Sequence, residues 1–192
     1  MIKAVIFDCF GVLATEGWIP FRNAHFGNDP EKLRQANELM HVLDSAGMNY
    51  DEFIEVTARL ANVSPAELQG SLEPNVPEEA LFAFIKSLKP QYKVAMLSNA
   101  GENQLNRIFT PEHLVLFDAL ALSCETGYVK PDVAAYQHVA RVLGVTPGQC
   151  VFTDDQPHYL EGARQAGMQV VQFESADQCI RDIQVVLSRS GE

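Results

Sequence analysis

Six residues have side chains that could together transfer a phosphoryl group, and each follows a short apolar run or lies in the loop after one. They are Asp8, Ser98, Asn99, Lys130, Asp154 and Asp155. Carboxylates brought close together repel one another unless a cation lies among them, and a set of oxygen ligands without His or Cys suits Mg²⁺. A carboxylate beside such a metal, with an ammonium group and hydrogen-bond donors opposite, supplies a nucleophile, charge neutralisation and donors for the phosphoryl oxygens.

The apolar runs before these residues have the pattern of strands buried on both faces, because they are continuous rather than alternating. They cover residues 4–7, 94–97, 120–122, 151–152 and 170–173. Helical patterns lie beside them, at residues 78–88, 134–143 and 159–166. This succession predicts an α/β fold with a doubly wound parallel sheet, whose strand ends bring the six polar residues to one edge.

The segment 14–77 behaves differently from the rest of the chain. It has helical periodicity over 31–43 and 50–60, a helix start at Ser64-Pro65, and no convincing strand. We therefore expect an α/β core domain made of residues 1–13 and 78–192, with a small helical cap inserted between them over 14–77. An insertion after the first strand lies over the carboxyl edge of the sheet, where ligands of open α/β sheets bind.

Charge and cysteine usage narrow the class of partner. The 192 residues include 14 Lys and Arg against 25 Asp and Glu, a formal charge of −11, which argues against nucleic acid or an anionic membrane as a partner. No stretch approaches the roughly 18 apolar residues of a membrane span, and the N-terminus lacks a signal-peptide core, so we expect a cytoplasmic protein with a small-molecule substrate. The cysteines are far apart and are expected to be free thiols: Cys9, Cys124, Cys150 and Cys179.

The motifs that carry the six polar residues resemble those of the haloacid dehalogenase superfamily. They read FDCFGVL at 7–13, MLSNA at 96–100, GYVKPD at 127–132 and FTDDQPHYLEGARQAGM at 152–168. Their order and spacing match the family over the whole chain, and the helical insertion corresponds to the family's small α-helical cap. The resemblance implies a Rossmann-like core and a hydrolase.

By this resemblance, Asp8 would be the nucleophile of a phosphatase and would pass through an aspartyl-phosphate. Mg²⁺ would be held by the Asp8 carboxylate, the backbone carbonyl of Phe10 and Asp155. Asp154 would be a second acidic ligand, directly or through water. The resemblance thus implies Mg²⁺ as the cofactor and a small phosphorylated metabolite as the substrate.

The remaining motif residues would act on the phosphoryl group itself. By the same resemblance, the Ser98 hydroxyl and the Asn99 backbone N–H would hold that group, and Lys130 would neutralise it and orient Asp8. Gly11 would allow the turn by which the chain leaves the sheet. Cys9, beside the nucleophile, is either a spectator or an oxidation-sensitive thiol.

One position departs from the phosphatase pattern. Phosphatases of the family usually carry a second Asp two residues after the nucleophile, where this chain has Phe10. A missing general acid lowers the rate by about 10²- to 10⁴-fold. We therefore expect a preference for phosphate esters with acidic alcohols, unless another residue such as His158 or His25 supplies the proton.

Phe10 also keeps two other interpretations open. A dehalogenase-like hydrolase has an aromatic residue there, together with the Ser98-Asn99 pair and a tyrosine at the position of Tyr136. A pseudoenzyme would keep the fold and bind a ligand without catalysis. Dehalogenases need no metal and lack the acidic pair, so Asp154 and Asp155 favour the metal-dependent phosphatase.

Overall fold

The core of the protein is a five-stranded parallel sheet. The computed structural model describes residues 1–45, 47–73, 75–89, 91–100 and 104–189. The strands lie in the order β3-β2-β1-β4-β5, and every neighbouring pair is parallel. Their bounds are β1 Ala4–Phe7, β2 Lys93–Ser98, β3 Ala119–Leu122, β4 Cys150–Asp154 and β5 Gln169–Gln172. The predicted doubly wound α/β fold is confirmed.

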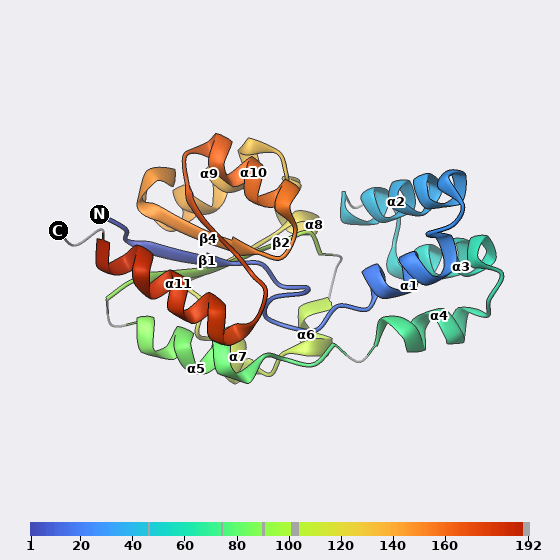
Figure 1. The fold of residues 1–192 in the computed structure, drawn as a ribbon, viewed down its shortest axis with the longest axis horizontal. Coiled ribbons are helices and arrows are strands. Elements are labelled where there is room, and N and C mark those ends of the chain that lie inside the picture. The colour runs from blue at the N-terminus through green and yellow to red at the C-terminus, as the bar shows by residue number, and fades with distance from the viewer. Residues whose placement is uncertain (46, 74, 90, 101–103, 190–192) are drawn as a thin grey trace.

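Helices cover both faces of the sheet, which explains the continuous apolar runs. Figure 1 shows α9 (Val133–Val142) and α10 (Pro157–Ala166) on one face, and α5 (Glu79–Leu88) and α11 (Ala176–Arg189) on the other. Along β1, Val5 and Phe7 belong to the same core cluster as α5 and α11, whereas Ala4 and Ile6 belong to that of α9 and α10. Alternate side chains of β1 are therefore buried in different layers.

Four helices between β1 and α5 form a separate helical unit, seen beside the sheet in Figure 1. They are α1 Trp18–Phe26, α2 Pro30–Asp44, α3 Tyr50–Ala61 and α4 Pro65–Leu72. The unit has its own apolar core, in which Phe26, Phe53 and Leu68 are fully buried. α4 begins as its sequence predicts, because Ser64 Oγ accepts from the Glu67 N–H at 3.2 Å and Pro65 follows the cap.

Two connectors join the helical unit to the core, and they run side by side. Ala14 forms an antiparallel bridge with Pro77. The Glu78 N–H donates to the Leu13 carbonyl at 2.9 Å, and the Thr15 N–H donates to the Val76 carbonyl at 3.0 Å. The chain therefore leaves and re-enters the core at one place. We interpret this arrangement as a helical insertion over residues 14–77 in a core of residues 1–13 and 78–192.

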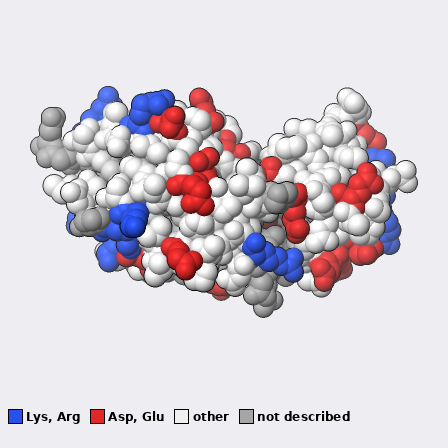
Figure 2. Space-filling view, turned by 90° about the horizontal axis from the view of Figure 1, so that it is seen from below, with Lys and Arg blue, Asp and Glu red and all other residues white. Residues whose placement is uncertain are grey.

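The remaining helices are short. They are α6 Gln104–Ile108, α7 Pro111–Leu114, α8 Ser123–Thr126 and a 3₁₀ turn over Pro147–Gln149. Within the part of the chain that the structure describes, none of the helices is long and apolar enough to cross a membrane. On the face shown in Figure 2, the described Lys and Arg side chains form small separate groups among Asp and Glu.

Candidate active site

The carboxyl edge of the sheet holds a buried ion cluster of one ammonium and two carboxylates. Lys130 Nζ, from the loop between α8 and α9, lies 2.5 Å from Asp8 Oδ1 and 2.6 Å from Asp154 Oδ2. Asp8 follows β1 and Asp154 ends β4, which pair directly in the sheet. The exposed fractions of the three residues are only 3%, 5% and 0%. The topology therefore brings together three residues that are far apart in sequence, as the motif positions predict.

Burial and charge act against each other in this cluster. Burial opposes the charge of Lys130, but the attraction of Asp154 and Asp8 outweighs it and raises the pKa of the ammonium. Burial raises the pKa of Asp8 to about 8; Lys130 acts in the opposite direction, while Asp154 adds to the rise. One positive charge thus faces two buried carboxyl groups, and a further cation would favour the ionised form of both.

A third carboxylate completes an acidic cluster beside Lys130. Asp8, Asp154 and Asp155 each offer a carboxylate oxygen, and these oxygens lie within 4.8 Å of one another. Gln156 orients the last two of these carboxylates: its N–H donates to Asp154 Oδ1 at 2.8 Å, and its Nε2 donates to Asp155 Oδ2 at 2.5 Å. An all-oxygen donor set of this kind fits Mg²⁺.

Gly11 makes room for this cluster. Its φ is +86°, and a Cβ built there would lie 2.9 Å from Asp155 Cγ. A side chain at this position would therefore meet both a strained backbone and the carboxylate. The role expected for Gly11 at the turn after β1 is consistent with this geometry.

Gly11→Ala should lower the free energy of unfolding more than Gly127→Ala does. Gly127 has a similar φ of +73° but nothing within 4 Å of a built Cβ. Gly127→Ala should therefore lose only the conformational term of about 1–2 kcal/mol. Gly11→Ala should lose a further ~1–3 kcal/mol from overpacking against Asp155. Urea unfolding of both variants measures the difference, and equal losses would contradict the close approach.

Ser98 and Asn99 lie at the end of β2, next to the ion cluster. Ser98 Oγ is buried and has no well-aligned hydrogen-bond partner among the described residues. The Asn99 side chain binds the backbone of Lys130 twice: Oδ1 accepts from its N–H at 2.8 Å, and Nδ2 donates to its carbonyl at 3.1 Å. Asn99 thus positions the Lys130 loop, a role that its place after a strand does not reveal.

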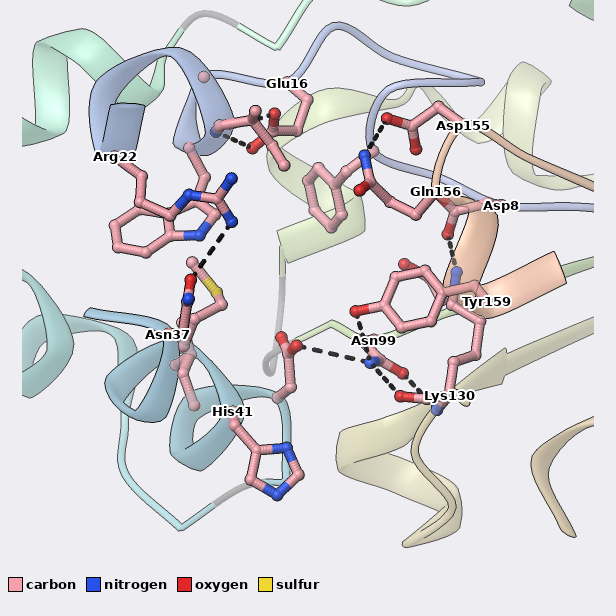
Figure 3. A pocket seen from close by; sticks show the side chains of 18 of the residues that line it. Asp8, Glu16, Arg22, Asn37, His41, Asn99, Lys130, Asp155, Gln156 and Tyr159 are labelled. Atoms are coloured by element: carbon pink, nitrogen blue, oxygen red, sulfur yellow. Dashed lines mark hydrogen bonds and ion pairs between the residues drawn. The ribbon is translucent and has the colours of Figure 1, made fainter. Parts of the chain in front are cut away.

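A cavity of about 460 Å³ lies between the carboxyl edge and the helical unit. Figure 3 shows Arg22, Asn37 and His41 on one side of it, with Asp8 and Lys130 on the other. Several helical-unit residues that sequence analysis did not assign to the site line this cavity: Asn37, Met40, His41, Asp44 and Tyr50. The helical unit therefore supplies one wall of a site whose charged groups come from the core.

The residues behind the alternative interpretations take different places. Tyr136 is fully buried and its hydroxyl donates to the Tyr159 carbonyl at 2.6 Å, so it packs beneath the site. His158 is exposed at the cavity, while His25 stacks on Phe21 and is not among the lining residues.

Burial raises the pKa of the Cys9 thiol well above its usual value, and Asp8 adds to the rise, so this thiol is held in its unreactive form.

The motif positions and this geometry agree with the comparison to protein families. The family model of the haloacid dehalogenase-like hydrolases matches residues 2–167. The chain belongs to this family. The enzyme class expected from its motifs, a hydrolase, is thereby confirmed.

Curated relatives of this haloacid dehalogenase-like hydrolase include phosphatases. Phosphatase MT3486 of Mycobacterium tuberculosis is 47% identical over 53 residues, which cover 28% of this chain and 24% of the relative. Flavin mononucleotide hydrolase 1 of Arabidopsis thaliana is 41% identical over 61 residues, which cover 32% of this chain and 25% of the relative. The matched segments thus span about a quarter of the length of each of these proteins.

Solved structures of haloacid dehalogenase-like hydrolases share the fold over nearly the whole chain. A predicted family hydrolase of Porphyromonas gingivalis has a TM-score of 0.74 at 24% identity, covering 97% of this chain and 98% of its own. A Bacteroides thetaiotaomicron enzyme in complex with magnesium and inorganic phosphate has a TM-score of 0.67 at 21% identity, covering 90% of this chain and 94% of its own. An L-2-haloacid dehalogenase of Xanthobacter autotrophicus has a TM-score of 0.61 at 23% identity, covering 90% of this chain and 77% of its own. The fold therefore occurs both in an enzyme solved with magnesium and inorganic phosphate and in a haloacid dehalogenase.

Proposed function

We propose that this hydrolase is a Mg²⁺-dependent phosphatase that acts on a small phosphorylated metabolite of the cytoplasm. The observation that carries the proposal is the acidic cluster of Asp8, Asp154 and Asp155 beside buried Lys130. A metal-independent dehalogenase has no use for three carboxylates this close together. The names of the phosphatase relatives, and the magnesium and phosphate in the solved Bacteroides enzyme, support the same choice.

In this proposal Asp8 attacks phosphorus and forms an aspartyl-phosphate. Lys130 binds Asp8 Oδ1 and so restricts the orientation of the nucleophile. Ser98 Oγ, with no well-aligned partner among the described groups, is available to donate to a phosphoryl oxygen. Mg²⁺, held by Asp8, Asp155 and the Phe10 carbonyl, with Asp154 as a further acidic ligand, would neutralise the negative charge of the carboxylates and the phosphoryl group.

One assay separates this function from its alternatives. The protein is incubated with p-nitrophenyl phosphate and with 2-haloacids, each with and without Mg²⁺. Phosphate release that requires the metal supports the proposal. Metal-independent halide release would identify a dehalogenase-like hydrolase, and the absence of both activities would indicate a pseudoenzyme.

Mg²⁺ should also raise the melting temperature of the protein. A ligand that binds only the folded state stabilises it by about 2.7 kcal/mol at a hundred times its Kd. For a chain of this length that corresponds to roughly 5–10 °C. In Asp155→Ala the increase should be mostly lost, because one of the three clustered carboxylates is gone.

Glu55→Gln is the matched control for this measurement. It removes a carboxylate from an exposed position of α3, and Glu55 is not among the residues that line the cavity. Its melting temperature should respond to Mg²⁺ as that of the native protein does. A native protein whose melting temperature ignores millimolar Mg²⁺ would count against the metal site.

A further inference from the structure

The last residue of α2 carries a carboxyl group that lies at the cavity and has no role in the proposed reaction as described above. Asp44 is the last residue of α2 and lines the same cavity as Asp8. Two contacts attach it to the core: Ser123 Oγ donates to its backbone carbonyl at 2.5 Å, and Asn99 Nδ2 lies 3.5 Å from its Oδ2. Asp44 is therefore the point at which the end of α2 contacts the carboxyl edge of the sheet.

The surroundings of this carboxyl group are mostly uncharged. From the core it faces the Asn99 amide, the Tyr159 phenol and, further away, the charge of Lys130. On its own helix, His41 lies one turn earlier and also lines the cavity. Among the described residues, Asp44 forms no ion pair with a basic side chain. Lys130 itself is engaged by Asp8 and Asp154, so Asp44 has no cation of its own.

The proposed reaction needs a proton donor that the motif around the nucleophile does not supply. Phe10 lines the cavity with a side chain that can neither give nor take a proton. Glu16, in the connector before α1, also lines the cavity, but both its carboxylate oxygens accept from the Ile19 N–H, at 3.0 and 3.1 Å. His25 is not among the lining residues. His158 is largely exposed, and partial burial of its ring lowers its pKa. A partly buried donor that lines the cavity is better placed than an exposed imidazole to protonate a departing oxygen.

We propose that Asp44 is the general acid and base of this hydrolase, supplied by the helical unit at the site where Phe10 leaves none. This inference rests on the proposed phosphatase function. When Asp8 attacks phosphorus, the bond to the ester oxygen breaks, its electron pair stays on that oxygen, and the Asp44 proton moves to it, so an alcohol leaves. Asp44, now a carboxylate, then takes a proton from the water that attacks the aspartyl-phosphate; the bond to Asp8 breaks, and inorganic phosphate is released.

The protonation state of Asp44 is consistent with both steps. Burial raises its pKa to about 7, while the hydrogen bond from Asn99 and the charge of Lys130 act in the opposite direction. A group that titrates near neutral pH is present in both forms there, so it can donate in the first step and accept in the second.

The test compares leaving groups in the native protein and in Asp44→Asn, with Mg²⁺ present and under single-turnover conditions. p-Nitrophenolate is a weak base and can leave without being protonated. The butyl oxygen of butyl phosphate is strongly basic and must receive a proton as it leaves. Asp44→Asn should therefore slow phosphoryl transfer from butyl phosphate by about 10²- to 10⁴-fold and from p-nitrophenyl phosphate by less than about tenfold. Since the second step also loses its base, phosphorylated Asp8 should accumulate in the variant during turnover of p-nitrophenyl phosphate.

A pH profile gives a readout that a merely structural role of Asp44 would not change. The acid must be protonated, so transfer from butyl phosphate by the native protein should fall as pH rises through the pKa of Asp44. This fall should be absent in Asp44→Asn. Glu38→Gln, which changes an exposed carboxylate on the same helix, should keep the native profile and the native rates.

The outcomes that overturn the inference are distinct from those that overturn the function. Equal rate losses for the two esters in Asp44→Asn, or no loss for either, would exclude Asp44 as the proton donor while leaving the phosphatase intact. A native protein that releases no phosphate from p-nitrophenyl phosphate with Mg²⁺ would overturn the phosphatase function, and the inference with it.

Discussion

Replacing Asp8 with Asn should abolish phosphate release while the protein stays folded. Asn has the shape of Asp but lacks the ionised oxygen that attacks phosphorus, so turnover should fall on the order of 10⁴-fold or more. The fold should survive because Lys130 keeps its second partner, Asp154, at 2.6 Å. Steady-state phosphate release measures the loss, and the urea midpoint of the variant measures its stability.

A second measurement connects this loss with the covalent step. Acid quenching of the native protein during turnover should trap a phosphoryl group on the peptide that contains Asp8, and the same peptide of Asp8→Asn should carry none. Substantial turnover by a purified Asp8→Asn protein would contradict every mechanism in which this carboxylate is the nucleophile.

Lys130→Met should strongly destabilise the protein. The variant keeps a side chain of similar length but leaves the Asp8 and Asp154 carboxyl groups buried without their cation. Removing one partner of a buried ion pair lowers the free energy of unfolding by about 3–5 kcal/mol. Urea unfolding at pH 8 without divalent cations measures this loss.

The loss should shrink as the pH falls. Burial raises the pKa of Asp8 and Lys130 acts against this rise, so without Lys130 the folded-state pKa of Asp8 lies further above that of the unfolded chain, and protonation stabilises the folded state. The variant should thus be relatively more stable at pH 5.5 than at pH 8. Lys89→Met is the control, since Lys89 pairs with Asp118 at 2.7 Å but both side chains are partly exposed; its loss should stay near or below about 1 kcal/mol. Similar losses of unfolding free energy in the two variants would show that burial of the ion cluster does not add to the cost of removing its lysine.

Much of the fold could be predicted from local patterns, because each strand and helix carries its own signal. The continuous apolar runs identify all five strands, and Ser64-Pro65 marks the start of α4 within one residue. α1 gives no such signal, since its N-cap residue is Gly17 and the helix has little amphipathic character. α11 is not among the helices predicted from the sequence, although Cys179, Ile183 and Leu187 recur every four residues and are buried, a spacing typical of a helix that packs by one face.

The core side of the site was predictable for the same reason, whereas the cavity wall was not. Parallel strands end at one edge, so residues that follow β1, β3 and β4 converge there, and the structure brings Asp8, Lys130 and Asp154 into contact. The contacts of Asp44 with Asn99 and Ser123 join residues 55 and 79 positions apart in different units. They depend on how α2 packs against the sheet edge, which no local pattern of the sequence encodes.

The paired connectors at Ala14 and Pro77 have a consequence for how this protein can change in evolution. An insertion whose two ends already meet can be shortened, enlarged or exchanged without rerouting the sheet, so substrate preference can diverge while the reacting groups of the core stay in place. If Asp44 supplies the proton, the helical unit of this protein cannot be exchanged in this way without loss of activity. The core would then depend on its insertion for a step of the chemistry, and a chimera with another helical unit should lose turnover of alkyl phosphates even where its new cavity binds them.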